Sequence, residues 1–150
     1  MKTIIALLIA LAACAQTKPD PQLTPGVADP AVTQATLGQT VCAPGYTLKV
    51  RDVPEGIKRA VALEYGLKLP LKPGAFEVDH WIPLEIGGDN DIRNLWPQPA
   101  LPIPGFRQKD RVETYLKRQV CSGAMTLRQA QEDIPDWVEI WKQLEVGKLK

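Results

Sequence analysis

The stretch that decides the fold is Phe76-Glu-Val-Asp-His-Trp-Ile-Pro-Leu-Glu-Ile-Gly-Gly-Asp-Asn-Asp-Ile-Arg-Asn-Leu-Trp96, and it holds the only histidine of the chain, His80. An acid, Asp79, precedes this histidine directly, and Gly87-Gly88 follows it. Two consecutive glycines supply the backbone freedom that a tight reversal needs. We therefore expect this stretch to turn back on itself after the Asp79-His80 dipeptide.

Two apolar runs flank the reversal. Residues 76–78 suit a short strand, and residues 92–96 suit a second one. We expect Pro97 and Pro99 to end the second strand, because proline cannot donate to a strand ladder. A helical pattern starts near Gly105. The order is therefore a hairpin and then a helix, with Asp79-His80 at a strand end.

At these residues the chain resembles a known family. Asp79-His80-x-x-Pro-Leu-x-x-Gly-Gly-x5-Asn94-Leu95, with Lys109-Asp110 beyond it, resembles the HNH endonucleases (the ββα-metal or His-Me finger family), in particular a small exported bacterial branch. The resemblance extends from Cys42 to about Trp141. It implies an α+β fold, with a small ββα-metal hairpin-plus-helix core and additional flanking α-helices, over residues 41–147.

The resemblance also implies a reaction and its residues. Members of the family are metal-dependent nucleases, so we expect hydrolysis of DNA phosphodiester bonds with low sequence specificity. His80 would be the general base, Asp79 a metal ligand, and Asn94 the asparagine that fixes the loop and the histidine. The implied cofactor is one divalent ion, with Mg2+ favoured over Mn2+ or Zn2+. Two alternatives stay open: cleavage of RNA, and a catalytically inactive HNH-fold lipoprotein that only binds.

The chain departs from the family pattern at the remaining metal ligands. Many HNH proteins place a further histidine on the helix or just before it, and this chain has no second histidine. Oxygen ligands could substitute, and the candidates are Gln98, Asp110 and Glu113. The single histidine and the absence of a Cys-x-x-Cys pair argue against tight zinc binding.

The basic residues offer candidate contacts for nucleic acid. The net charge is only +1, so their distribution matters more than the total. The residues expected to bind phosphates are Arg93, Arg107, Lys109 and Arg111. A second set lies before the motif and would contribute if its members share one face: Lys49, Arg51, Lys58, Arg59, Lys68 and Lys72. Lys109 and Glu113 are also spaced to pair on a helix, either beside the core or facing the site.

The first residues indicate export. Lys2 and the apolar run 4–11 are too short to span a bilayer as a mature helix, and they end in Leu11-Ala-Ala-Cys14. This pattern resembles a lipoprotein signal over residues 1–14 with lipidation at Cys14, so we expect a membrane-anchored protein on the periplasmic or cell-surface side. The alternative is an ordinary secretory signal and a secreted protein. Residues 15–40 contain several prolines and few large apolar residues, which predicts a disordered linker.

The other two cysteines are expected to form a disulfide. Cys42 and Cys121 flank most of the predicted domain, and an exported chain folds in an oxidising compartment. The alternative is two unpaired buried thiols. Elsewhere we expect a short strand at 46–51, a helix from Pro54 to about Gly66, and helices at 106–120, 126–134 and from 137. A monomer is expected.

Overall fold

The computed structural model describes residues 16–149, which form a mixed α+β fold around one two-stranded antiparallel sheet. This confirms the α+β class. In chain order the elements are η1 (Leu37–Gln39), α1 (Tyr46–Val50), α2 (Glu55–Glu64), β1 (Phe76–His80), η2 (Leu84–Ile86), η3 (Ile92–Asn94), β2 (Leu95–Pro99), α3 (Phe106–Cys121), α4 (Leu127–Asp133), η4 (Ile134–Asp136) and α5 (Trp137–Glu145). No helix within the described residues is long and apolar enough to cross a membrane.

The hairpin pairs β1 with β2 in a register that joins Asp79 to Trp96 and His80 to Leu95. The prediction that the strand ends before Pro97 is wrong, because Pro97 lies inside β2, whereas Pro99 is indeed the last residue of the strand. The backbone N of Trp81 donates to the carbonyl of Asn94, which sets the alternation of hydrogen-bonded pairs along the ladder. Pro97 and Pro99 therefore belong to the pairs that exchange no backbone hydrogen bonds. Their nitrogen atoms point away from β1, so neither proline removes a hydrogen bond from the ladder.

The turn between the strands depends on Gly88. A Cβ added there would lie 1.7 Å from the carbonyl oxygen of Ile82. No side chain fits that distance, so only glycine allows the loop to close on itself. The preceding Gly87 has φ +81°, which agrees with the reversal expected from the sequence.

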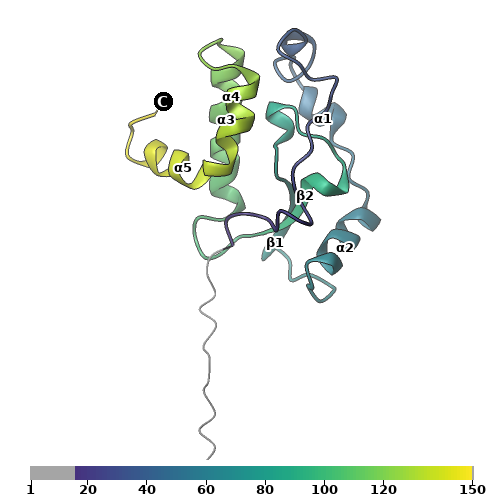
Figure 1. The fold of residues 1–150 in the computed structure, drawn as a ribbon. Coiled ribbons are helices and arrows are strands. Elements are labelled where there is room, and N and C mark those ends of the chain that lie inside the picture. The colour runs from purple at the N-terminus through teal and green to yellow at the C-terminus, as the bar shows by residue number, and fades with distance from the viewer. Residues whose placement is uncertain (1–15, 150) are drawn as a thin grey trace, which may run out of the picture.

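Helices lie on both sides of the hairpin (Figure 1). α3, α4 and α5 gather on one side, whereas α1 and α2 lie on the other. A capping box opens α4: the Thr126 hydroxyl accepts from the N–H of Gln129, and the Gln129 side chain accepts from the N–H of Thr126. The strand expected at 46–51 is wrong, because this segment forms helix α1 after Gly45.

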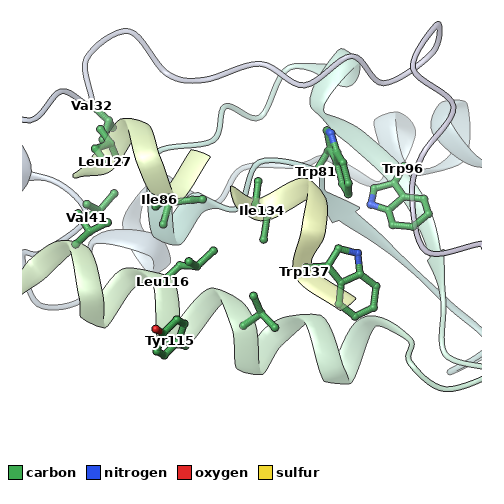
Figure 2. Packing of buried hydrophobic residues seen from close by; sticks show 13 residues of the cluster. Val32, Val41, Trp81, Ile86, Trp96, Tyr115, Leu116, Leu127, Ile134 and Trp137 are labelled. Carbon is green, nitrogen blue, oxygen red and sulfur yellow. The ribbon is translucent and has the colours of Figure 1, made fainter. Parts of the chain in front are cut away.

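The core lies mainly between α3 and the segments that cover it. Val112, Leu116 and Val120 form the buried stripe of α3, at the helical spacing visible in the sequence. Figure 2 shows tryptophans at one end of this core and aliphatic side chains at the other, and its members include Trp81, Trp96, Trp137, Ile134, Ile86, Val32, Val41 and Leu127. Trp81 and Trp96 meet edge to face with ring centroids 6.2 Å apart, a favoured aromatic geometry.

Residues 16–40 differ from the expected disordered linker, because they pack along the hairpin. Val32 is buried in the core. The Thr24 hydroxyl donates to the carbonyl of Leu95 at 2.8 Å, and Ala28 forms a bridge with Gly88. The prediction rested on low apolar content, but this segment gains order from backbone hydrogen bonds to the loops of the hairpin. Cys14 and the rest of the expected signal over residues 1–14 lie outside the described residues.

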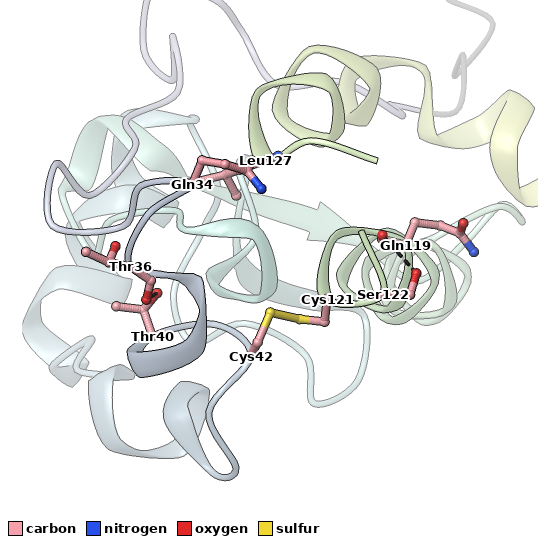
Figure 3. The surroundings of a disulfide bond; sticks show 8 residues. All are labelled: Gln34, Thr36, Thr40, Cys42, Gln119, Cys121, Ser122 and Leu127. Atoms are coloured by element: carbon pink, nitrogen blue, oxygen red, sulfur yellow. Dashed lines mark hydrogen bonds between the residues drawn. A yellow bond between two sulfur atoms is a disulfide. The ribbon is translucent and has the colours of Figure 1, made fainter. Parts of the chain in front are cut away.

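The expected disulfide joins Cys42 to Cys121, with 5.6 Å between their Cα atoms. It ties the loop after η1 to the last residue of α3 (Figure 3). The two cysteines are 79 residues apart, and closing a loop of that length is nominally worth ~4 kcal/mol in the chain-entropy account. The bond therefore holds the N-terminal part of the domain on the helix that follows the hairpin.

Candidate functional site

Asp79 and His80 leave β1 on opposite faces. Both belong to the regular strand, where successive side chains alternate. Asp79 meets α3 through Lys109, whereas His80 lines a groove on the side of α2. A shared site for the two side chains would need the strand to bend or end between them, and it does not. The structure therefore places the predicted general base and the predicted metal ligand on different sides of the hairpin.

The His80 imidazole is oriented by Asn90, a residue that the sequence motif did not identify as functional. His80 Nε2 lies 3.0 Å from Asn90 Oδ1, and the amide nitrogen of Asn90 donates to the carbonyl of Val50 at 2.7 Å. That second bond fixes which end of the amide faces the ring, so Nε2 carries the hydrogen and donates. In the neutral ring, Nδ1 then holds the lone pair and is the proton acceptor.

The environment of His80 favours the neutral ring. His80 is only 2 % exposed. Burial lowers the pKa of the imidazole below its ordinary value of 6.5, and this outweighs the opposite effects of the Asn90 hydrogen bond and the Asp79 charge. A buried, oriented and neutral imidazole has the properties that a general base requires near neutral pH.

The groove beside His80 has a volume of about 1010 Å³. Three exposed basic residues line it: Arg51, Lys58 and Arg59. The acids Asp52, Glu55 and Glu77 also line it, and Lys58 pairs with Glu55 at 3.6 Å. Apolar side chains, among them Phe76, form the rest of the wall. The sequence identified the three basic residues only as part of a scattered set, and the packing of α2 beside β1 brings them together next to His80.

On the opposite face, Lys109 lies in a cluster of oxygen acceptors. Its ammonium donates to Asp79 Oδ2 at 2.8 Å, to the carbonyl of His80 at 2.8 Å, and to the carboxylate of Glu113. All three hydrogens of the ammonium are thereby used. Lys109 has no exposed surface, so this charge is shared entirely within the protein. The spacing of Lys109 and Glu113 predicted their pairing.

Burial and the excess of carboxylates shift the pKa values in this cluster. Burial alone would lower the pKa of Lys109, but Asp79 and Glu113 raise it well above its ordinary value, so the ammonium stays charged. Burial raises the pKa of Glu113 to about 8, against the opposite effect of Lys109. On the same helix, partial desolvation of its carboxyl group and the nearby Asp79 raise the pKa of Asp110, although the residue as a whole is exposed.

The structure places the predicted metal ligands Asp79 and Gln98 in different surroundings, and Asp110 stays a predicted ligand. One oxygen of Asp79 accepts from Lys109 and the other from the N–H of His80. Gln98 is fully buried, and both polar atoms of its amide lack a hydrogen-bond partner within residues 16–149. Among the described residues, no group of three or more His, Cys, Asp or Glu side chains could hold a metal ion.

The residues predicted to contact nucleic acid do not line the groove. The prediction is wrong for Lys109, because a side chain without exposed surface cannot reach a phosphate. The other three are exposed and each has a neighbour: Arg93 pairs with Asp91, Arg111 with Glu145, and Arg107 lies over the ring of Phe106. The basic residues of the groove, Arg51, Lys58 and Arg59, replace Lys109 as candidates.

Asn94 holds the loop that follows β1. Its side-chain oxygen accepts from the N–H groups of Ile82 and Val27, and its amide nitrogen donates to the carbonyls of Ile82 and Asp89. Asn94 is completely buried, and these bonds satisfy both ends of its amide. The arrangement suits the loop-fixing role that the resemblance implies. The contact with Val27 also explains how the N-terminal segment is held against the hairpin.

No known protein-family model matches the chain, and neither a curated protein nor a solved structure matches it. The chemistry of the site therefore follows from its own geometry. That geometry consists of an oriented neutral histidine at a groove with basic residues on one face of the hairpin, and a buried ammonium held by oxygens on the other.

Proposed function

We propose that this chain is an exported HNH-type nuclease that hydrolyses phosphodiester bonds of DNA, with His80 as the general base. The observation that carries the proposal is the placement of His80, which Asn90 orients at the wall of a groove that also holds Arg51 and Arg59. The hairpin followed by α3 agrees with the ββα arrangement that the sequence motif implies.

The groove offers two of the functions that phosphodiester cleavage needs. Nδ1 of His80 can take a proton from the attacking water. The guanidinium groups of Arg51 and Arg59 can bind phosphate oxygens and stabilise the charge that develops on them. A divalent ion, with Mg2+ favoured, stays part of the proposal, and it would supply further stabilisation of phosphate charge. Gln98 and Asp110 remain candidate ligands, and Asp79 would have to exchange its contact with Lys109 for the ion.

The groove residues give a test of substrate binding. Arg51→Glu and Arg59→Glu are each expected to weaken DNA binding and to reduce the salt dependence of the binding constant by a slope of about 1. Binding would be measured by fluorescence anisotropy at several salt concentrations, and cleavage by plasmid nicking in Mg2+, Mn2+ and EDTA. Arg128→Glu is the matched control, because Arg128 is an exposed arginine on α4, paired with Glu132. Equal effects of the groove variants and the control would contradict the assignment of the groove.

The same assays separate the alternative functions. An RNA of the same sequence, compared with the DNA, shows which nucleic acid is cleaved. Groove-dependent binding without nicking in any metal would favour the catalytically inactive lipoprotein that only binds.

Export is a further part of the proposal, supported by the Cys42–Cys121 disulfide, a bond typical of oxidising compartments. We expect the wild type to partition with membranes through lipid on Cys14, and Cys14→Ser to be released or left unprocessed. Cell fractionation and detergent partitioning measure this. Equal solubility of the two forms would contradict the lipid anchor and leave the secreted alternative.

A further inference from the structure

The cluster around Lys109 has the composition of a cation site. Its three acceptors are oxygens, from the Asp79 carboxylate, the His80 backbone and the Glu113 carboxylate. Hard divalent ions such as Mg2+, Mn2+ and Ca2+ prefer such ligands. The acceptors come from β1 and α3, so they meet where the hairpin packs on the helix. Gln98 lies on the same face of the hairpin as Asp79, and its buried amide has no partner among the described residues.

We propose that the Lys109 ammonium takes the place of a divalent metal ion at this junction, so that the wild-type chain carries a built-in cation and binds no metal at Asp79. The Asp79, His80 and Glu113 oxygens then form a latent divalent site that opens only when Lys109 is removed. This inference rests on the proposed function and identifies the Lys109 ammonium as the cation at the junction of the hairpin and α3. Its test reads metal binding instead of cleavage, so either proposal can fail alone.

Geometry and charge support the replacement. The ammonium lies 2.8 Å from both Asp79 Oδ2 and the His80 carbonyl, so it is in direct contact and no water separates it from these oxygens. Asp79 and Glu113 each direct a carboxyl oxygen at the ammonium, and a divalent ion can bind both oxygens. Truncation of a fully buried lysine would leave both the acceptors and the space that the side chain occupied. The ion would therefore enter a site whose ligands are already placed on a strand and a helix.

The experiment titrates Mn2+ into the mature, disulfide-bonded protein after EDTA dialysis, with binding read by electron paramagnetic resonance and by calorimetry. Wild type and Asp79→Asn are expected to give the same isotherm, because Asp79 holds no metal in either. Lys109→Ala is expected to gain one Mn2+ per chain, bound at least tenfold more tightly than any Mn2+ on the wild type. The gain should disappear when Asp79→Asn is added to Lys109→Ala.

A matched control removes a basic residue at the same helical spacing from its acid. Arg128→Ala breaks the exposed i,i+4 pair with Glu132 on α4, and it should gain no Mn2+. If Lys109→Ala does not fold without metal, recovery of a cooperative thermal transition on adding Mn2+ supports the proposal equally. Stoichiometric Mn2+ on the wild type that Asp79→Asn removes would overturn it. Failure of Lys109→Ala to bind or to be rescued by Mn2+ would also overturn it.

Discussion

Replacing His80 with alanine is expected to lower the rate of phosphodiester cleavage by roughly 10²–10⁴-fold, the range for loss of a general base. Alanine removes the Nδ1 acceptor, and no other histidine in the chain can take over its role. Substrate affinity should change little, because Arg51 and Arg59 remain in the groove. Single-turnover cleavage and equilibrium binding, measured on the same DNA, separate the two effects. Near-normal cleavage by His80→Ala would reject His80 as the base.

The pH dependence of cleavage is a second test of His80 as the general base. Cleavage needs the neutral ring, and burial lowers the pKa of His80 below 6.5. The rate should therefore decline at a lower pH than it would for a histidine with the ordinary pKa, as protonation removes the acceptor. Because the chain has one histidine, its nitrogen resonances can be followed without ambiguity, and they should show hydrogen on Nε2 in the neutral form. A neutral ring with hydrogen on Nδ1 would contradict the role given to Asn90.

Replacing Lys109 with methionine is expected to lower the free energy of unfolding by roughly 3–5 kcal/mol, the usual cost of removing one partner from a buried charge cluster. Methionine keeps much of the length of lysine, so the loss comes mainly from charge. The buried Asp79 carboxylate is then left without its cation, and Glu113 loses its hydrogen-bond donor. Urea denaturation at neutral pH measures the loss. Part of the stability should return as the pH falls, because protonation neutralises Asp79.

An internal control shows whether burial is the cause. Arg128 and Glu132 have the same i,i+4 spacing as Lys109 and Glu113, but their side chains are 80 % and 59 % exposed. Arg128→Met should cost no more than about 0.5 kcal/mol, since exposed pairs contribute little. Similar losses for the two variants would mean that the cluster at Lys109 does not stabilise the fold through its buried charges.

Local patterns predicted several elements of the fold because short-range physics decides them. The helices expected at 106–120 and 126–134 lie within about one residue of α3 and α4 as observed. The expected end of the second strand was wrong because of the prolines in β2. A proline disrupts a strand ladder only where its nitrogen faces the partner strand. The direction in which the nitrogen faces is a property of the pairing register and is not visible in β2 alone.

The candidate site was predictable in its residue types and only partly in its arrangement. The sequence alone identified His80 as the single imidazole, Asn94 as a candidate for holding the loop, and Lys109 with Glu113 as a pair. It could not place Asn90 against His80, because that contact requires the loop to return to the end of β1.

The amino-acid sequence by itself determined the order hairpin then helix, the reversal at Gly87-Gly88 and the cysteine pair, because each depends on local backbone preference or on which residues are present. Only the tertiary structure decided what each side of the hairpin does. Strand alternation sends Asp79 toward α3 and His80 toward the groove at α2, and the packing of α3 carries the Lys109 ammonium to Asp79. Two adjacent residues thus enter different environments because helices cover the two faces of one strand.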